Sequence, residues 1–144
     1  VGGHFRHCLE FVNCFLAGVQ NGRIDYERRE RNHQIETMRE YAMTQYMHTV
    51  GALESFSAEK FVSDGLDNFL LVKPEDAGDA DFWCESSIER ELEFLLSHTI
   101  HHYALIGFKL RSFGYSLPVE FGVAPSTLNF WKEQKGKQKS SARI

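Results

Sequence analysis

The feature that most constrains the fold is a run of apolar residues at helical spacing from Ile88 to Phe113. These residues recur at steps of three and four, which puts them on one face of a helix of about seven turns. The preceding Ser86-Ser87-Ile88-Glu89 predicts a capping box, in which Ser86 accepts a backbone hydrogen bond and Glu89 reaches back. Gly114 predicts the end of the helix. A helix of this length with one apolar face indicates an all-α bundle.

The first 54 residues predict two further helices. Val1–Gln20 has apolar residues at helical spacing and ends at the stop signal Asn21-Gly22. Arg23–Arg31 is dense in charge, and we expect a solvated loop or an irregular connection there. A second helix is predicted from Asn32, as its N-cap, to Glu54.

The middle and the end of the chain are less regular. Phe61-Val62 and Phe69–Val72 predict one or two short strands, which would place a short β-hairpin between helices. An acidic loop is expected at Pro74–Asp81, and a short helix capped by Ser126 is expected to run through Trp131. We therefore predict one domain, residues 1–131, followed by a basic tail, residues 132–144, that we expect to be disordered.

Charge and composition exclude several classes of protein. The net charge is −4, and the tail from Lys132 carries +4 of its own, which leaves −8 on residues 1–131. Such an acidic body argues against nucleic-acid binding, although the tail could touch an acidic surface; a solvated terminus is the favoured interpretation. No apolar run approaches the roughly 20 residues that span a bilayer, and no signal peptide is visible.

The cysteines bear on the cellular compartment. Cys8, Cys14 and Cys84 are odd in number and do not have the spacing of metal ligands. We interpret them as buried free thiols in a reducing compartment, and therefore expect a cytoplasmic protein.

Histidines carry the strongest chemical signal. His98 and His102 are four residues apart in the Ile88–Phe113 helix, so that their imidazoles point to one place. Two neutral imidazoles placed in this way are half of a site for a divalent transition metal. His7, on the first helix, would complete a three-histidine site and leave coordination positions open, as in catalytic metal sites.

Alternatives remain open for each of these residues. The paired histidines could be hydrogen-bonded core groups that bind no metal. His4 reads more readily as a solvated terminal residue, yet it or Glu10 could be a fourth ligand that closes a structural site. Glu10 could instead act as an acid or base. Glu91, on the face that carries His98, could accept from an imidazole N–H, although a surface ion pair is favoured.

Two further features near these residues are weaker. The charged segment Asp25–Arg31 could cap the cleft and hold an anionic substrate through arginine, but a plain surface loop is favoured. Tyr103 could donate a hydrogen bond to a substrate, although such a tyrosine is more often part of a core. Cys8 points about 100° away from His7 on a helix, which argues against a Cys-His nucleophile.

The segment Gly2-Gly3-His4-Phe5-Arg6-His7-Cys8-Leu9-Glu10, followed by His98-x-x-His101-His102, resembles the DinB-like superfamily. The resemblance implies His7, His98 and His102 as metal ligands and His101 as a neighbouring histidine that is not a ligand. It implies an antiparallel four-helix bundle with a long crossover connection and a metal in a cleft between helices. Similar proteins include thiol-dependent S-transferases and hydrolase-like enzymes, and many have no known reaction.

One family feature is missing from this sequence. The family usually has a helix before the one with the early histidine, and here that helix is either absent or was truncated before Val1. The C-terminal segment or a partner subunit would then fill the gap, and a missing helix favours a homodimer.

We therefore expect a metal-dependent enzyme, a thiol S-transferase or a hydrolase, that uses Zn, Ni or Fe and acts on a small molecule. Its ligands would be His7, His98 and His102, with Glu10 as the nearest acid or base. The alternative is a non-enzymatic module in which the metal braces the helices. Neither nucleic acid nor membrane is an expected partner.

Overall fold

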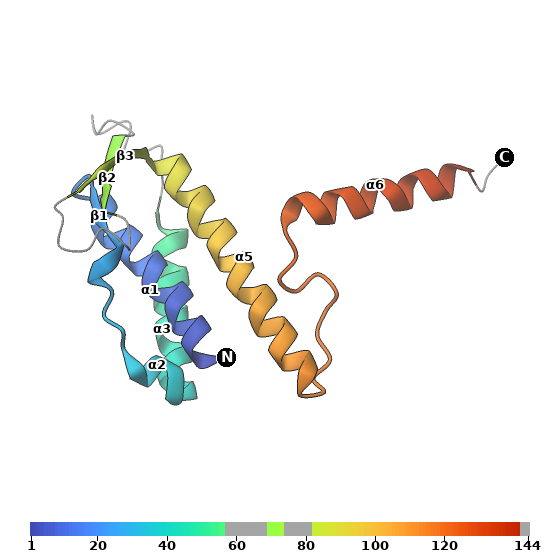
Figure 1. The fold of residues 1–144 in the computed structure, drawn as a ribbon, viewed down its shortest axis with the longest axis horizontal. Helices are drawn as coiled ribbons and strands as arrows, with labels where there is room; N and C mark the ends of the chain where they lie inside the picture. Colours follow the sequence, from blue (N-terminus) through green and yellow to red (C-terminus); the bar gives the residue numbers. More distant parts are fainter. Residues whose placement is uncertain (57–68, 74–81, 142–144) are drawn as a thin grey trace. The chain divides into compact units, whose positions relative to one another are not determined.

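The computed structural model describes residues 1–56, 69–73 and 82–141. The chain divides into two compact units, Val1–His98 and Thr99–Ile144. The elements follow in the order α1 (Gly2–Val19), β1 (Arg23–Asp25), a 3-10 turn η1 (Tyr26–Arg28), α2 (His33–Thr37), α3 (Arg39–Glu54), β2 (Phe69–Lys73), β3 (Cys84–Ser87), α5 (Ile88–Ser112) and α6 (Pro125–Ser141) (Figure 1). Helix α5 runs without a break through the boundary between the units.

In the first unit, α1 and α3 lie side by side and run in the same direction (Figure 1). Two helices can be parallel neighbours only if the chain returns between them, and residues 20–38 make this crossover through β1, η1 and α2. The beginning of α5 runs the opposite way. The mostly helical fold predicted from the sequence is confirmed.

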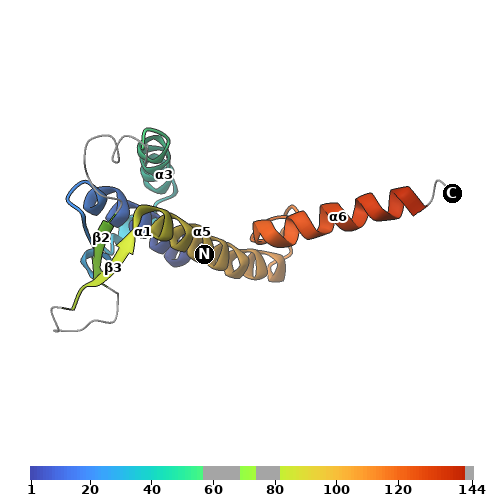
Figure 2. The ribbon, with the colours of Figure 1, turned by 90° about the horizontal axis from the view of Figure 1, so that it is seen from above.

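A small sheet was only partly expected. Its strand order is β1-β2-β3, with β1 parallel to β2 and β2 antiparallel to β3. Figure 2 shows β2 and β3 as neighbours, with β3 leading into α5. The strand predicted at Phe69–Val72 is confirmed as β2, and its antiparallel partner is β3. Phe61-Val62 and the acidic loop Pro74–Asp81 lie outside the described residues.

Two apolar clusters hold the first unit together. The larger one joins α1 to the sheet and to the start of α5, because α1 presents aromatic and aliphatic side chains at helical spacing. Its buried members are Phe11, Phe15, Val19, Ile24, Tyr26, Leu70, Val72, Ile88 and Leu95. The smaller cluster joins α1 to α2 and α3 through Leu9, Ile35 and Ala42.

Of the two alternatives expected at Arg23–Arg31, the solvated loop is wrong, while the segment does form an irregular connection with a short strand and a 3-10 turn. Ile24 and Tyr26 are buried at 0% and 3% exposure, and even Arg29 is 8% exposed. Apolar residues at every second position within this charged segment let β1 join the sheet while the charged neighbours face outward. Ile24 and Tyr26 belong to the core, whereas Arg23, Arg28, Glu30 and Arg31 are exposed.

Helix boundaries agree with the sequence more closely, with two corrections. Asn32 caps a helix as predicted, through Gln34 N–H. The predicted Asn32–Glu54 helix is broken at Met38, whose extended backbone separates α2 from α3. The cap of α5 lies one residue later than predicted, because Ser87 Oγ accepts from the backbone N–H of Arg90.

The second unit contains the rest of α5 and α6. The helix ends at Ser112, and Gly114 follows it with a φ of 84°, a left-handed conformation that glycine adopts without strain. The returning chain packs on α5 through the stacked rings of Tyr103 and Phe121, whose centroids are 5.4 Å apart. The short helix predicted to begin with Ser126 as its cap is α6, but it begins earlier, at Pro125, so Ser126 lies within it. The helix continues to Ser141 through most of the tail that was expected to be disordered.

The structure bears on two expectations, the absence of a membrane-spanning helix and the state of the cysteines. Over the described ranges, no helix has the length and apolar character that a membrane crossing requires. All three cysteines are free thiols as expected, but only Cys8 is buried; Cys14 and Cys84 are half-buried.

Candidate metal centre

Three histidines from two helices meet beside the main core. His7 lies on α1, and His98 and His102 lie one turn apart on α5. The Nε2 atoms of His7 and His98 are 3.2 Å apart, and one ring nitrogen from each of the three residues lies within 4.8 Å of the others. All three side chains are half-buried. The structure therefore brings together the three residues that the sequence selected.

These distances fit a shared metal ion. Two imidazole nitrogens bound about 2.1 Å from one tetrahedral ion are about 3.4 Å apart. The 3.2 Å between His7 and His98 is close to this value. The nitrogens of the full set all lie within 4.8 Å of one another, and a shared ion would draw them closer together. The three-histidine group can hold a divalent transition metal.

The same 3.2 Å contact also allows a hydrogen bond between the two rings. In that case one imidazole carries its proton on Nε2 and the other accepts it, as the tautomers dictate. A metal would instead take the lone pairs of both nitrogens. The two states differ in metal content, which makes them experimentally separable.

Aromatic rings hold the imidazoles of His7 and His98 in place. The ring of Phe11, one turn beyond His7 on α1, has its centroid 4.7 Å from that of His7 and 4.3 Å from that of His98. Phe94, one turn before His98 on α5, stacks on His98 at 5.5 Å with an interplanar angle of 11°. Phe11 is 2% exposed, so the wall of the site belongs to the core.

Glu10 lies near His7 in the sequence, but its carboxylate is engaged elsewhere. It is 3% exposed, and its Oε1 accepts from the backbone N–H of Asn32 at 2.7 Å. Its Oε2 accepts from Arg6 Nη1 at 2.8 Å. These bonds tie α1 to the start of α2. We interpret Glu10 as an anchor for the crossover, while a catalytic role for it stays a prediction.

Glu91 is not the surface residue that the sequence favoured. It is 1% exposed, and its carboxylate accepts from Tyr26 Oη at 2.8 Å, Ser86 Oγ at 2.6 Å and Arg90 Nη1 at 3.1 Å. A buried carboxylate needs such donors, because desolvation of a charge is costly. Burial first, and then the charge and the hydrogen bond of Glu91, raise the pKa of Tyr26 well above its usual range. The tyrosine therefore stays protonated as the donor.

Arg29 is buried, which its place in the charged segment Asp25–Arg31 did not predict. Its guanidinium donates to the backbone carbonyl of Tyr26 at 2.9 Å and lies over the ring of Phe11, 4.5 Å from its centroid. The alternation of Ile24 and Tyr26 was the signal that this segment turns inward. Arg29 covers the ring of Phe11, which contacts both imidazoles, where the sequence suggested a surface loop.

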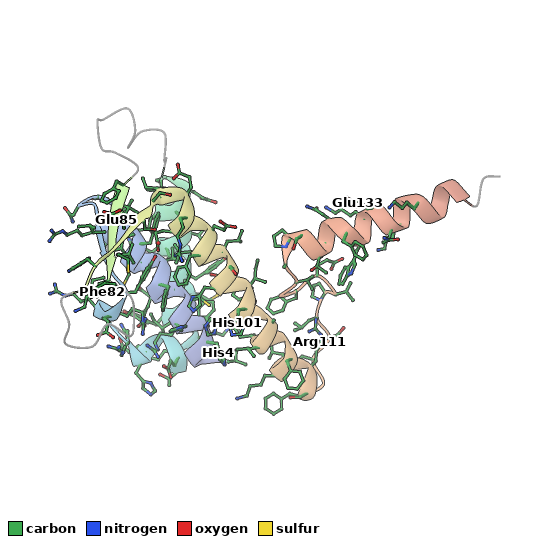
Figure 3. All side chains as sticks on the ribbon, turned by 45° about the horizontal axis from the view of Figure 1, so that its top comes forward. His4, Phe82, Glu85, His101, Arg111 and Glu133 are labelled. Atoms are coloured by element: carbon green, nitrogen blue, oxygen red, sulfur yellow. The ribbon has the colours of Figure 1, made fainter. Side chains whose placement is uncertain are left out.

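The remaining histidines near the site differ in exposure. His101, labelled in Figure 3, is exposed on α5, and His4, also labelled there, is half-buried on α1. The described residues that meet the geometric requirement for a shared ion are His7, His98 and His102, without His4 or Glu10. Burial raises the pKa of the Cys8 thiol to about 11, which makes it a poor nucleophile and agrees with the prediction against a Cys-His pair.

Comparisons with known proteins give little further information. No family model matches the chain, and no solved structure matches it. A protein named FK506-binding protein 5, from Rhizopus delemar, is 34% identical over 113 residues. The match covers 77% of this chain but 28% of the fungal protein, so the chain corresponds to a minor part of that relative.

Proposed function

We propose that this chain is a metal-binding domain in which His7, His98 and His102 bind one divalent transition metal. The observation that carries the proposal is that ring nitrogens of all three residues lie within 4.8 Å of one another. His7 and His98, the closest pair, lie on different helices and are 91 residues apart in the sequence. A chance surface pair on a single helix would not recruit a third imidazole from another helix. Zn, Ni and Fe all suit imidazole ligands.

We further propose that the domain is of the DinB-like type. The order and spacing of the ligand histidines support this, as does the crossover that makes α1 and α3 parallel neighbours (Figure 1). His101, exposed beside the ligand pair, fits the position that the resemblance implies for a histidine outside the site. Binding of FK506 is not part of the proposal, because the chain matches only 28% of the protein with that name.

A metal-dependent enzyme is the activity that the site supports best. Three protein ligands leave room for water or substrate, and a bound ion there would supply Lewis acidity and a lowered pKa for a water or a thiol. In thiol transfer, the sulfur forms a bond to an electrophilic carbon, the leaving group departs with its electron pair, and the thiol proton passes to solvent. In hydrolysis, water replaces the thiol. The substrate would be a small molecule.

The test is an activity assay with matched variants. Purified protein would be assayed with a low-molecular-weight thiol and an alkylating electrophile, and separately with an activated ester, each with and without added Zn²⁺, Ni²⁺ or Fe²⁺. We expect metal-dependent turnover that His98→Ala abolishes and that His101→Ala, a change to the exposed neighbour, retains. Equal rates in wild type and His98→Ala would refute an enzyme that uses this site.

The second candidate is a non-enzymatic module braced by its metal. It is favoured by one observation, that His7 and His98 come from different helices, so that an ion would crosslink α1 to α5. A bracing ion adds its binding free energy to folding. A loss of several kcal/mol in unfolding free energy on chelation, with no turnover in either assay, would support this function over the enzyme.

A further inference from the structure

A buried hydrogen bond between Tyr26 and Glu91 lies close to the histidines and has no function in the proposed metal site so far. Tyr26 belongs to η1, and its hydroxyl donates to the carboxylate of Glu91 at 2.8 Å. Both side chains are almost fully buried, at 3% and 1% exposure. Glu91 precedes His98 by two helical turns, so the pair fixes η1 against the helix face that carries the histidine.

From Tyr26, ring contacts continue to both helices of the site. The ring of Tyr26 stacks on Phe11 with centroids 5.0 Å apart and an interplanar angle of 20°. Phe11 in turn lies against His7 at 4.7 Å and His98 at 4.3 Å. The position of the Phe11 ring therefore constrains the imidazoles of His7 on α1 and His98 on α5.

We propose that Tyr26, held by its hydrogen bond to Glu91, positions Phe11 and through it sets the separation of His7 and His98 for metal binding. Tyr26 is a positioning residue, because it acts on the ligand histidines through the ring of Phe11. The inference rests on the proposed metal site. It goes beyond it in assigning a function to the η1 segment, which the sequence presented as a charged surface loop.

The size of the effect follows from the kind of contact. Groups that hydrogen-bond directly to metal ligands typically change metal affinity by about 10- to 100-fold when they are removed. Tyr26 acts on the histidines only through the ring of Phe11, and Tyr26→Phe removes one oxygen and retains the stacked ring. We therefore expect the lower part of this range, an affinity about 10-fold weaker.

The experiment uses Co²⁺ as the probe, because its visible absorption reports the geometry of its ligands. Co²⁺ affinity and spectrum would be measured for wild type, Tyr26→Phe and the matched control Thr49→Val. Thr49 is 3% exposed, and its hydroxyl donates to Asn13 Oδ1 at 2.9 Å. Like Tyr26→Phe, this change removes one buried hydroxyl that donates a hydrogen bond. Thr49 takes no part in the ring contacts that connect Tyr26, Phe11 and the histidines. Urea unfolding of each protein would give the stability for comparison.

We expect Tyr26→Phe to bind Co²⁺ about 10-fold more weakly with altered absorption bands, and Thr49→Val to keep the affinity and spectrum of wild type at a similar loss of stability. A second variant, Glu91→Gln, would keep Oε1 toward Ser86 and Arg90 and place its NH₂ group toward Tyr26. The tyrosine oxygen can accept from that NH₂ group, so this variant retains a hydrogen bond and should change the spectrum less than Tyr26→Phe does.

Wild-type affinity and spectrum in Tyr26→Phe would overturn the inference while leaving the three-histidine site intact. Equal effects in Tyr26→Phe and Thr49→Val, in proportion to stability, would also overturn it. A wild-type protein that binds no Co²⁺ would overturn both the site and the inference.

Discussion

Replacing Glu10 by glutamine tests whether this buried carboxylate is an anchor of the fold. Its two oxygens accept from the Asn32 N–H at 2.7 Å and from Arg6 at 2.8 Å, at 3% exposure. Glutamine retains an acceptor for one donor and turns its NH₂ toward the other, which leaves a buried donor unsatisfied. Loss of one charge-assisted hydrogen bond with that penalty costs about 2 to 4 kcal/mol.

The assay is urea unfolding followed by circular dichroism at neutral pH, with Glu93→Gln as the control. Glu93 is exposed on α5, where such a change is within about 0.5 kcal/mol. We expect a lower midpoint for Glu10→Gln at an unchanged slope, and unchanged metal content in the folded protein. A variant as stable as the control that has lost turnover would refute the anchor and support a catalytic Glu10.

Three further outcomes are expected. Gly18→Ala should destabilise the protein by more than about 2 kcal/mol, because its Cβ would lie 2.4 Å from a backbone oxygen of β1, whereas Gly51→Ala, with nothing within 4 Å, should be neutral or stabilising in the same unfolding assay. The hydrogen bond from Arg6 lowers the pKa of the Glu36 carboxyl in the folded protein. The stability that the ionised Glu36 contributes is therefore present above the unfolded value of 4.5 and is lost as pH falls through the lower folded value. The urea midpoints of wild type and Glu36→Gln should converge as pH falls below 4.5, and parallel curves would contradict this. Cys8, whose pKa is raised to about 11, should resist iodoacetamide at pH 8 until urea unfolds the chain, and rapid labelling of the folded protein would refute its burial.

The helices and the site residues could be predicted because their signals are local. The stop at Asn21-Gly22 and the glycine after α5 depend on backbone preferences that neighbouring residues do not alter. His98 and His102 necessarily share one face of a helix, because they are four residues apart. Their meeting with His7 depended on tertiary packing, and there the family resemblance supplied the expectation.

The Arg23–Arg31 segment could not be predicted so easily, because its charge outweighed a short alternation of two apolar residues. Burial of Ile24 and Tyr26 comes from β1 pairing with β2, a contact between residues about 48 positions apart in the chain. The depth of Glu91 likewise depends on donors from η1, β3 and α5. The expected homodimer stays a prediction.

The central claim is that three histidines bind one metal ion, and elemental mass spectrometry of the purified protein tests it most directly. Wild type, His102→Ala and His101→Ala would be compared after identical purification, since the two substitutions are adjacent on α5 and differ in whether the residue belongs to the converging group. We predict about one equivalent of metal in wild type and in His101→Ala, and its loss in His102→Ala. Negligible metal in all three, or equal metal in both variants, would contradict the account.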